Sequence, residues 1–169
     1  TFADDNVHVL DPFTGTGTFI NRLLQSGLIP ADRLTYKYKN EIHANEIVLL
    51  AYYIASINIE TVYHDQMKTV NPDLQYAPFE GICLTDTFEM YEKDDLVSKV
   101  LIDNSERRKR QKNLDIRVIM GNPPYSAGQD SGNDNNANVA YPHLDERIRT
   151  SYVLNSKISL KNSLYDSYI

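Results

Sequence analysis

The chain has 169 residues, of which 41% are hydrophobic and 24% charged, as expected for one globular domain. Its formal net charge of -6 argues against a surface built mainly to bind nucleic-acid phosphates. The one cysteine, Cys83, excludes an internal disulfide and is expected to be a small core residue. No apolar stretch is long enough to cross a membrane, so we expect a cytoplasmic protein. Because the chain opens with Thr1, we expect it to be part of a longer polypeptide.

The first part of the chain predicts strands that alternate with helices. Residues 7–10 are rich in β-formers and end at Asp11. A glycine-punctuated turn follows, and apolar residues then recur at helical spacing as far as Gly27. Residues 42–47 predict a second strand, and residues 48–58 predict a helix with a wide apolar face.

The second part continues the alternation. Residues 81–85 predict a third strand that ends at Asp86, and residues 116–120 predict a fourth. Residues 126–138 are rich in Gly, Asn, Asp and Ser and predict an exposed, flexible loop. Residues 144–169 predict two helices divided near Ser156. This order of elements predicts an α/β fold, with a mostly parallel sheet covered by helices on both faces.

The first motif is a glycine-rich turn directly after the first predicted strand. Glycines let the backbone approach a ligand closely, and the amides that open the following helix can hold an anion. No lysine follows the last glycine, so an ATPase-type phosphate loop is excluded. A structural turn and a generic nucleotide site remain open. The motif comprises Asp11, Pro12, Phe13, Thr14, Gly15, Thr16, Gly17, Thr18 and Phe19.

Acidic residues follow the second and third predicted strands. Glu46 lies where a carboxylate can accept both ribose hydroxyls of a nucleoside. Glu41 is a rival, but the helix begins directly after Glu46. A charge that favours the helix N-terminus is the alternative role of Glu46. Asp86 can accept a hydrogen bond from an adenine amine, or it can be an ordinary turn residue.

The fourth predicted strand leads into Asn122-Pro123-Pro124-Tyr125. Two consecutive prolines form a stiff shelf, and Pro123 disfavours the helical conformation at Asn122. The side-chain carbonyl of Asn122 and the backbone carbonyl of Pro123 can then point at one spot. An exocyclic amine placed there donates both hydrogens, which directs its lone pair toward an electrophile. A rigid turn without catalytic function is the alternative.

Together these motifs resemble the γ-like amino-methyltransferases of bacterial restriction–modification systems. The resemblance covers residues 7–125 well and is greatest to the methyltransferase region of single-polypeptide enzymes that also carry a helicase. It implies a Rossmann-like fold that binds S-adenosyl-L-methionine and methylates the N6 amine of a flipped adenine in double-stranded DNA. Alternatives are a methyltransferase acting on RNA or a protein amide nitrogen, a non-catalytic cofactor-binding module, and a plain nucleotide-binding domain.

The resemblance also implies a role for each motif residue. The glycine-rich turn from Asp11 to Thr18 would frame the cofactor, with Thr16 and Thr18 near its carboxylate. Glu46 would take the ribose, Ile47 would pack on the cofactor adenine, and Asp86 would hold the amine of that adenine. The catalytic residues implied are Asn122, Pro123, Pro124 and Tyr125, with Tyr125 stacked on the target base. No metal is implied, and His8, His43, His64 and His143 lack the spacing of ligands.

We therefore expect a partial methyltransferase catalytic domain over residues 1–169. Its predicted parts are a cofactor-binding region (1–90), an insertion (87–114), a catalytic strand and loop (115–140) and a helical tail (141–169). The resemblance implies that target recognition lies beyond Ile169, that the segment closing over the methionine end of the cofactor lies before Thr1, and that further strands and a helicase lie elsewhere in the polypeptide. The isolated chain should therefore bind cofactor weakly at best and not methylate DNA. A basic cluster at residues 107–112 could contact DNA phosphates or form a solvated helix face.

Overall fold

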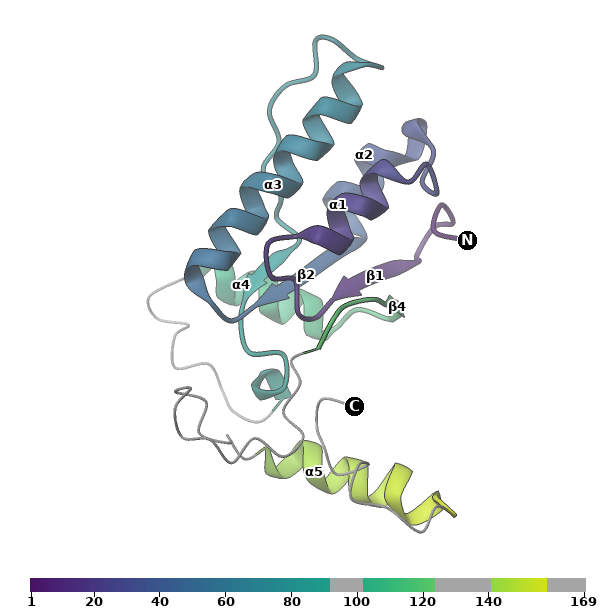
Figure 1. Cartoon of the computed structure of the whole chain (residues 1–169), viewed down its shortest axis with the longest axis vertical. Coiled ribbons are helices and arrows are strands. Elements are labelled where there is room, and N and C mark those ends of the chain that lie inside the picture. Colours follow the sequence, from purple (N-terminus) through teal and green to yellow (C-terminus); the bar gives the residue numbers. More distant parts are fainter. Residues whose placement is uncertain (92–101, 124–140, 158–169) are drawn as a thin grey trace. The chain divides into compact units, whose positions relative to one another are not determined.

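The computed structural model describes residues 1–91, 102–123 and 141–157 (Figure 1). The chain divides into two compact units, residues 1–87 with 95–122, and residues 88–94 with 123–169. The first unit contains, in chain order, β1 (His8–Asp11), α1 (Thr18–Gln25), α2 (Ala31–Asn40), β2 (Ile42–Glu46), α3 (Leu49–Lys68), β3 (Ile82–Leu84), α4 (Ile102–Lys112) and β4 (Ile116–Ile119). The four strands agree with the predicted ones to within one residue at each end.

The four strands form one parallel sheet in the order β3-β2-β1-β4. The chain moves outward from β1 through β2 to β3 and then returns to place β4 on the other side of β1. The strand order therefore reverses at β1, between β2 and β4. Ligands of open α/β sheets bind at the carboxyl ends of the strands near such a reversal. The predicted α/β class with a parallel sheet is confirmed, and it is compatible with a Rossmann-like fold.

The main core lies between one face of the sheet and helices α1, α2 and α3. Val9, Ile42, Ala44 and Ile82 supply the buried strand side chains. On α3 every fourth residue is buried, because side chains four apart lie on the same helix face. That stripe consists of Ala55, Ile59, Tyr63 and Met67.

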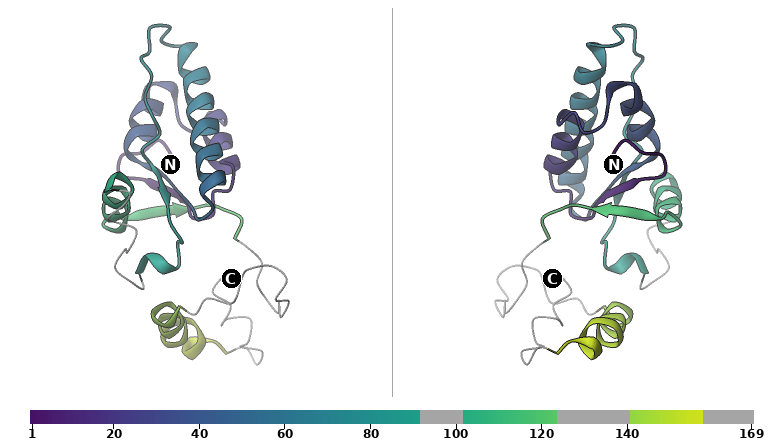
Figure 2. Two further views of the ribbon diagram at one scale, coloured as in Figure 1. Left: turned by 90° about the vertical axis from the view of Figure 1, so that its left-hand side faces the viewer. Right: turned by 90° about the vertical axis from the view of Figure 1, so that its right-hand side faces the viewer.

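Helix α4 covers part of the opposite face and the β3 edge. Alternate strand residues point to opposite faces, so His43 and Cys83 point away from the main core. Both are buried, and the positive charge of Arg110 on α4 acts on both. At the edge, the Asn104 side chain accepts the Leu84 N–H at 2.8 Å and donates to the Leu84 carbonyl at 3.0 Å. In both views of Figure 2 the strands lie between α3 and α4, as predicted for a sheet with helices on both faces.

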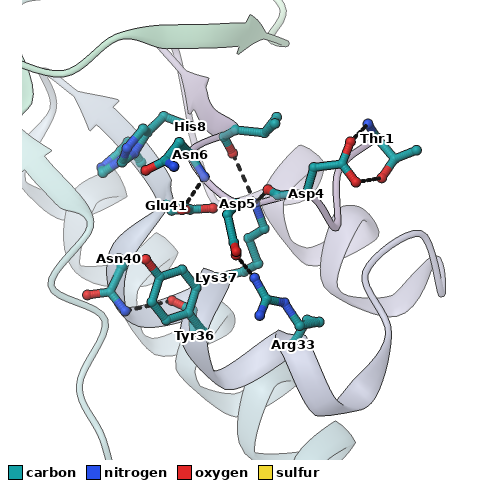
Figure 3. A network of polar contacts seen from close by, with 12 residues as sticks. Thr1, Asp4, Asp5, Asn6, His8, Arg33, Tyr36, Lys37, Asn40 and Glu41 are labelled. Atoms are coloured by element: carbon teal, nitrogen blue, oxygen red, sulfur yellow. Dashed lines mark hydrogen bonds and ion pairs between the residues drawn. The ribbon is translucent and has the colours of Figure 1, made fainter.

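A buried ion pair fixes the segment that leads into β1 (Figure 3). The Lys37 ammonium group on α2 pairs with Glu41 and also donates to the backbone carbonyls of Asp4 and Val7. Glu41 accepts the Asn6 N–H at 2.8 Å with its other oxygen. Burial by itself would raise the pKa of Glu41, but the hydrogen bonds from Lys37 and Asn6 outweigh it and hold the pKa below its ordinary value.

Helix α2 was not predicted from the sequence, and α3 is longer than predicted. The inner face of α2 comprises Leu34, Lys37 and Tyr38, so a charged residue interrupts its apolar periodicity. The prediction for α3 ended at residue 58, whereas the helix continues to Lys68 through the buried stripe. Of the apolar face expected at its start only Ala55 is buried, whereas Leu50 is 69% and Ile57 62% exposed within the described part of the chain.

The second unit contains the short helix η1 (Glu89–Tyr91), α5 (Pro142–Ile148) and a π-helical turn (Arg149–Val153). The rings of Phe88 and Tyr141 lie 5.4 Å apart between centroids. The helical residues end just before Ser156, where the sequence predicts a division. The second predicted tail helix and the predicted loop at 126–138 lie outside the described residues. None of the described helices combines the length and apolar character needed to span a membrane.

Candidate functional site at the carboxyl edge of the sheet

The positions singled out by the sequence lie at the ends of four neighbouring strands. Asp86 follows β3, Glu46 ends β2, Asp11 ends β1, and Asn122 follows β4. Because the strands are parallel, their carboxyl ends share one edge of the sheet. Asp11 is therefore flanked by Glu46 on one side and by the Gly121–Asn122 segment on the other.

The glycine-rich turn between β1 and α1 needs both of its glycines. Gly15 and Gly17 have φ of 56° and 91°, in the left-handed region that side chains disfavour. A Cβ on Gly17 would lie 3.2 Å from Ile59 Cγ1, so this glycine also lets the turn pack closely on α3. A Cβ on Gly15 would meet no other atom within 4 Å, so open space lies beside this residue.

Asp11 is a buried carboxylate with one unsatisfied oxygen. Its side chain is 0% exposed, and Oδ1 accepts the Phe13 N–H at 3.1 Å. Oδ2 is buried and has no hydrogen-bond donor among the described residues. Burial raises the pKa of Asp11 to about 6; the Phe13 hydrogen bond opposes this rise, and the nearby Glu46 carboxylate adds to it. A buried acceptor without a donor is uncommon in proteins, so this oxygen is a candidate acceptor for a donor group of a ligand.

Glu46 joins the glycine-rich turn to the start of α3. One carboxylate oxygen accepts the Gly15 N–H at 2.7 Å, and the other accepts the Val48 N–H at 2.7 Å. Each oxygen keeps a second lone pair for a further donor. The rival residue Glu41 lies at the opposite end of β2, in the buried pair with Lys37, so it takes no part in this edge.

The remaining turn residues are more exposed. Thr16, Thr18 and Ile47 are all exposed, with Ile47 64% exposed, while Pro12 and Phe13 are half-buried. Asn58 on α3 donates to the Thr16 carbonyl at 3.0 Å and so ties the exposed part of the turn to the helix.

The segment after β4 touches the glycine-rich turn. A Cβ on Gly121 would lie only 2.8 Å from Asp11 Oδ1 and 3.2 Å from Pro12 Cδ, so the bare backbone of Gly121 lies against Asp11. Asn122 is exposed, and Pro123 is half-buried. Pro124 and Tyr125 lie outside the described residues. The glycine-rich turn and the segment after β4 are therefore neighbours at Gly121.

Sequence reasoning did not predict a pair of side-chain hydrogen bonds at this edge, although the resemblance includes Asn45 in a ribose-binding strand. Asn45 donates to the Thr87 hydroxyl at 3.2 Å, and Thr87 donates to the Pro12 carbonyl at 2.7 Å. Their positions beside Glu46 and Asp86 were the available signal. The histidines were also expected to be scattered. In the structure, His8 Nδ1 and His43 Nε2 lie 3.0 Å apart on the face of the sheet that points away from the main core.

The basic cluster lies on α4, and two of its arginines have structural contacts. Arg107 donates to the Tyr52 hydroxyl at 3.0 Å, and Arg110 donates to the Glu80 carbonyl at 3.1 Å. Lys109 and Lys112 are exposed. These contacts favour the helix-face interpretation for the two arginines. No group of three or more His, Cys, Asp or Glu side chains suited to a metal ion occurs within residues 1–91, 102–123 and 141–157.

Nearly the whole chain is similar to one segment of solved restriction–modification enzymes. A nuclease-deletion mutant of the Type ISP enzyme LlaGI, in complex with a DNA substrate mimic, is 49% identical with a TM-score of 0.84; the match covers 98% of this chain and 14% of that one. The ATP-dependent Type ISP enzyme LlaBIII bound to DNA is 47% identical with a TM-score of 0.84, over 100% and 12% of the two chains. The DrdV–DNA complex is 44% identical with a TM-score of 0.79, over 94% and 15%.

The chain is thus homologous to a segment of Type ISP restriction–modification enzymes and spans only 12–15% of the solved chains that it matches. No protein-family model and no curated protein sequence matches it.

Proposed function

We propose that the chain forms the cofactor-binding and catalytic part of an S-adenosyl-L-methionine-dependent methyltransferase, which acts on the N6 amine of adenine in DNA within a restriction–modification enzyme. The observation that carries the proposal is the buried, unpartnered Oδ2 of Asp11 beside the glycine-rich turn. The backbone of Gly121, which directly precedes Asn122, lies against the same residue. Homology to restriction–modification enzymes solved with DNA supports the substrate class.

The residues at the edge fit the cofactor group by group. Its methionine end carries an ammonium group, which is the kind of donor that Asp11 Oδ2 lacks. Each oxygen of Glu46 retains a lone pair for one ribose hydroxyl. The exposed Ile47 offers an apolar surface to the adenine ring, and Asp86 follows the neighbouring strand as an acceptor for the adenine amine. Thr16 and Thr18, both exposed, would hold the carboxylate.

The catalytic residues in this proposal act on the target amine. The cofactor supplies an electrophilic methyl group on a sulfonium. The Asn122 side-chain carbonyl and the Pro123 backbone carbonyl accept the two hydrogens of the exocyclic amine and direct its lone pair toward that methyl group. Pro124 stiffens the loop, and Tyr125 stacks on the target base, which must leave the duplex because its amine is otherwise paired.

The remaining functions belong to other parts of the polypeptide in this proposal. With a net charge of -6 the chain is poorly suited to hold DNA phosphates by itself. The solved chains that it matches are about six to eight times as long, which leaves room for target recognition and for an ATP-dependent activity such as the one named for LlaBIII.

The first test is calorimetric titration of the protein carrying this chain with S-adenosylhomocysteine. Asp11→Ala should weaken binding by more than about tenfold, because it removes a charge-assisted hydrogen bond of about 1.5–3 kcal/mol. The control is Asp32→Ala, which removes an exposed carboxylate from α2. Equal binding by both variants would place the cofactor elsewhere.

The second test is transfer of a labelled methyl group to duplex DNA, with RNA and protein as competing acceptors. We expect N6-methyladenine in the nucleoside digest of the DNA. Asn122→Ala should lower the rate by about 100-fold or more, as for other positioned hydrogen-bonding groups, while S-adenosylhomocysteine affinity stays within about threefold. Label found in RNA or protein instead of DNA would overturn the substrate assignment.

A further inference from the structure

Three segments that are far apart in the sequence meet in a chain of two hydrogen bonds beneath the glycine-rich turn. Asn45 Nδ2 donates to Thr87 Oγ1 at 3.2 Å, and Thr87 Oγ1 donates to the Pro12 carbonyl at 2.7 Å. In the strand order, β2 lies between β3 and β1. The loop after β3 therefore reaches past the end of β2 to hold the turn after β1.

The chemistry of the three groups fixes the direction of both bonds. The Pro12 carbonyl can only accept, so the single hydroxyl proton of Thr87 must be donated to it. The Thr87 oxygen must then accept from Asn45, which orients the Asn45 amide with Nδ2 toward Thr87. The opposite end of that amide, Oδ1, is left buried and without a donor among the described residues. The fold therefore tolerates one unsatisfied acceptor while keeping the Thr87 contact.

The held residue, Pro12, lies at the start of the glycine-rich turn. Proline has no N–H, so the carbonyl is the only backbone group by which Pro12 can be held through a hydrogen bond. Pro12 lies between Asp11 and Phe13, whose N–H also bonds to Asp11. Asn45 holds the turn a second time, because its backbone carbonyl accepts the Thr14 N–H at 2.9 Å.

We propose that Thr87, oriented by Asn45, is a positioning residue that holds the glycine-rich turn in its ligand-binding conformation and ties the position of Asp86 to that of Asp11. This inference rests on the proposed function of the turn as a cofactor site. Thr87 directly follows Asp86, so its bond to Pro12 couples the two ends of the cofactor site across β2. Without the hydroxyl, the turn occupies its binding conformation for only part of the time. The apparent affinity then falls to that fraction of its intrinsic value.

The test compares three variants of the protein carrying this chain by titration with S-adenosylhomocysteine. Thr87→Val keeps the shape of the side chain and removes the hydroxyl, so we expect the dissociation constant to rise about tenfold, which corresponds to a turn competent about one tenth of the time. Thr87→Ser restores the hydroxyl and should bind within about threefold of the unaltered protein. Thr85→Val makes the same change two residues away, at a hydroxyl bonded to the Asp86 carbonyl, and should also bind normally.

Steady-state kinetics separates positioning from a general loss of structure. Thr87→Val should raise the KM for S-adenosylmethionine and leave kcat nearly unchanged, because the lost interaction acts on cofactor binding. Equal affinity of Thr87→Val and the unaltered protein would overturn the inference. A matching loss in Thr85→Val would also overturn it. If Thr87→Val does not fold, Thr87→Ser provides the test. Weak binding by Thr87→Ser, which retains the hydroxyl, would contradict the inference equally. Failure of the unaltered protein to bind the probe would instead refute the proposed function.

Discussion

Two buried carboxylates of the first unit differ in whether their oxygens are satisfied. Glu41 has partners for both oxygens, the Lys37 ammonium group and the Asn6 N–H. Asp11 is buried to the same extent, but its Oδ2 has no donor among the described residues. Glu41 lies at the amino end of β2, and Asp11 lies at the carboxyl end of β1, where ligands of such sheets bind. The satisfied group stabilises the fold, whereas the unsatisfied group is the one that our proposal assigns to the cofactor.

The two carboxylates also make opposite contributions to stability as the pH changes. The pKa of Glu41 lies below its ordinary value, so its contribution is present near neutral pH and is lost as the pH falls through that pKa. Burial raises the pKa of Asp11 to about 6. The contribution of Asp11 to the free energy of unfolding is therefore complete below pH 4 and is lost as the pH rises through about 6.

The largest expected effect comes from breaking the satisfied pair. Lys37→Met leaves the Glu41 carboxylate buried without its counter-ion and removes the donor to Asp4 and Val7. We expect the free energy of unfolding to fall by about 3–5 kcal/mol in urea denaturation at pH 7. Lys39→Ala removes an exposed lysine from the same helix and should change it by less than about 0.5 kcal/mol. Similar losses in the two variants would show that the buried pair has no special importance.

The next effect tests the unsatisfied group through its pH dependence. Asp11→Asn removes the titration, so the stability of the variant relative to the unaltered protein should increase between pH 4 and pH 8, by up to about 3 kcal/mol for a pKa rise of two units. Denaturation curves at several pH values measure the difference, and the titration of Glu41 cancels because both proteins contain it. A difference independent of pH would mean that the pKa of Asp11 is not raised.

The smallest effect concerns the exposed margin of the Lys37 network. Arg33 forms an ion pair with Asp5 (Figure 3), and the side chains are 35% and 66% exposed. Arg33→Ala should lower the free energy of unfolding by no more than about 1 kcal/mol, and the loss should shrink in high salt. A loss as large as that of Lys37→Met would contradict the distinction between buried and exposed pairs.

The sequence predicted the sheet and its carboxyl edge because their signals are local. Short apolar β-rich runs identify the strands, and Gly15 and Gly17 identify a turn that only glycine adopts easily. Helix α2 was missed because its buried face includes Lys37, whose burial depends on Glu41 and on backbone carbonyls thirty or more residues away in the chain. Hydrophobic periodicity contains no information about such partners.

Within the site, the positions of Asp11, Glu46, Asp86 and Asn122 at the strand ends were predictable from their places in the sequence. The contacts of Glu46 with Gly15 and of Thr87 with Pro12 were not, because each depends on how separate strands lie beside one another. The roles of these residues toward cofactor and DNA, and those of Pro124 and Tyr125, stay predictions.

The reactivity of the single thiol, Cys83, can report local opening of the sheet. Cys83 is 1% exposed in the middle of β3, opposite Asn45 in the strand register. Burial raises the pKa of this thiol to about 11, against the positive charges of three nearby arginines, so it reacts slowly while the strand stays in place. The rate at which a thiol reagent labels Cys83 therefore measures how often the sheet opens at β3. Slower labelling in the presence of S-adenosylhomocysteine would show that ligand binding at the strand ends reduces this local opening.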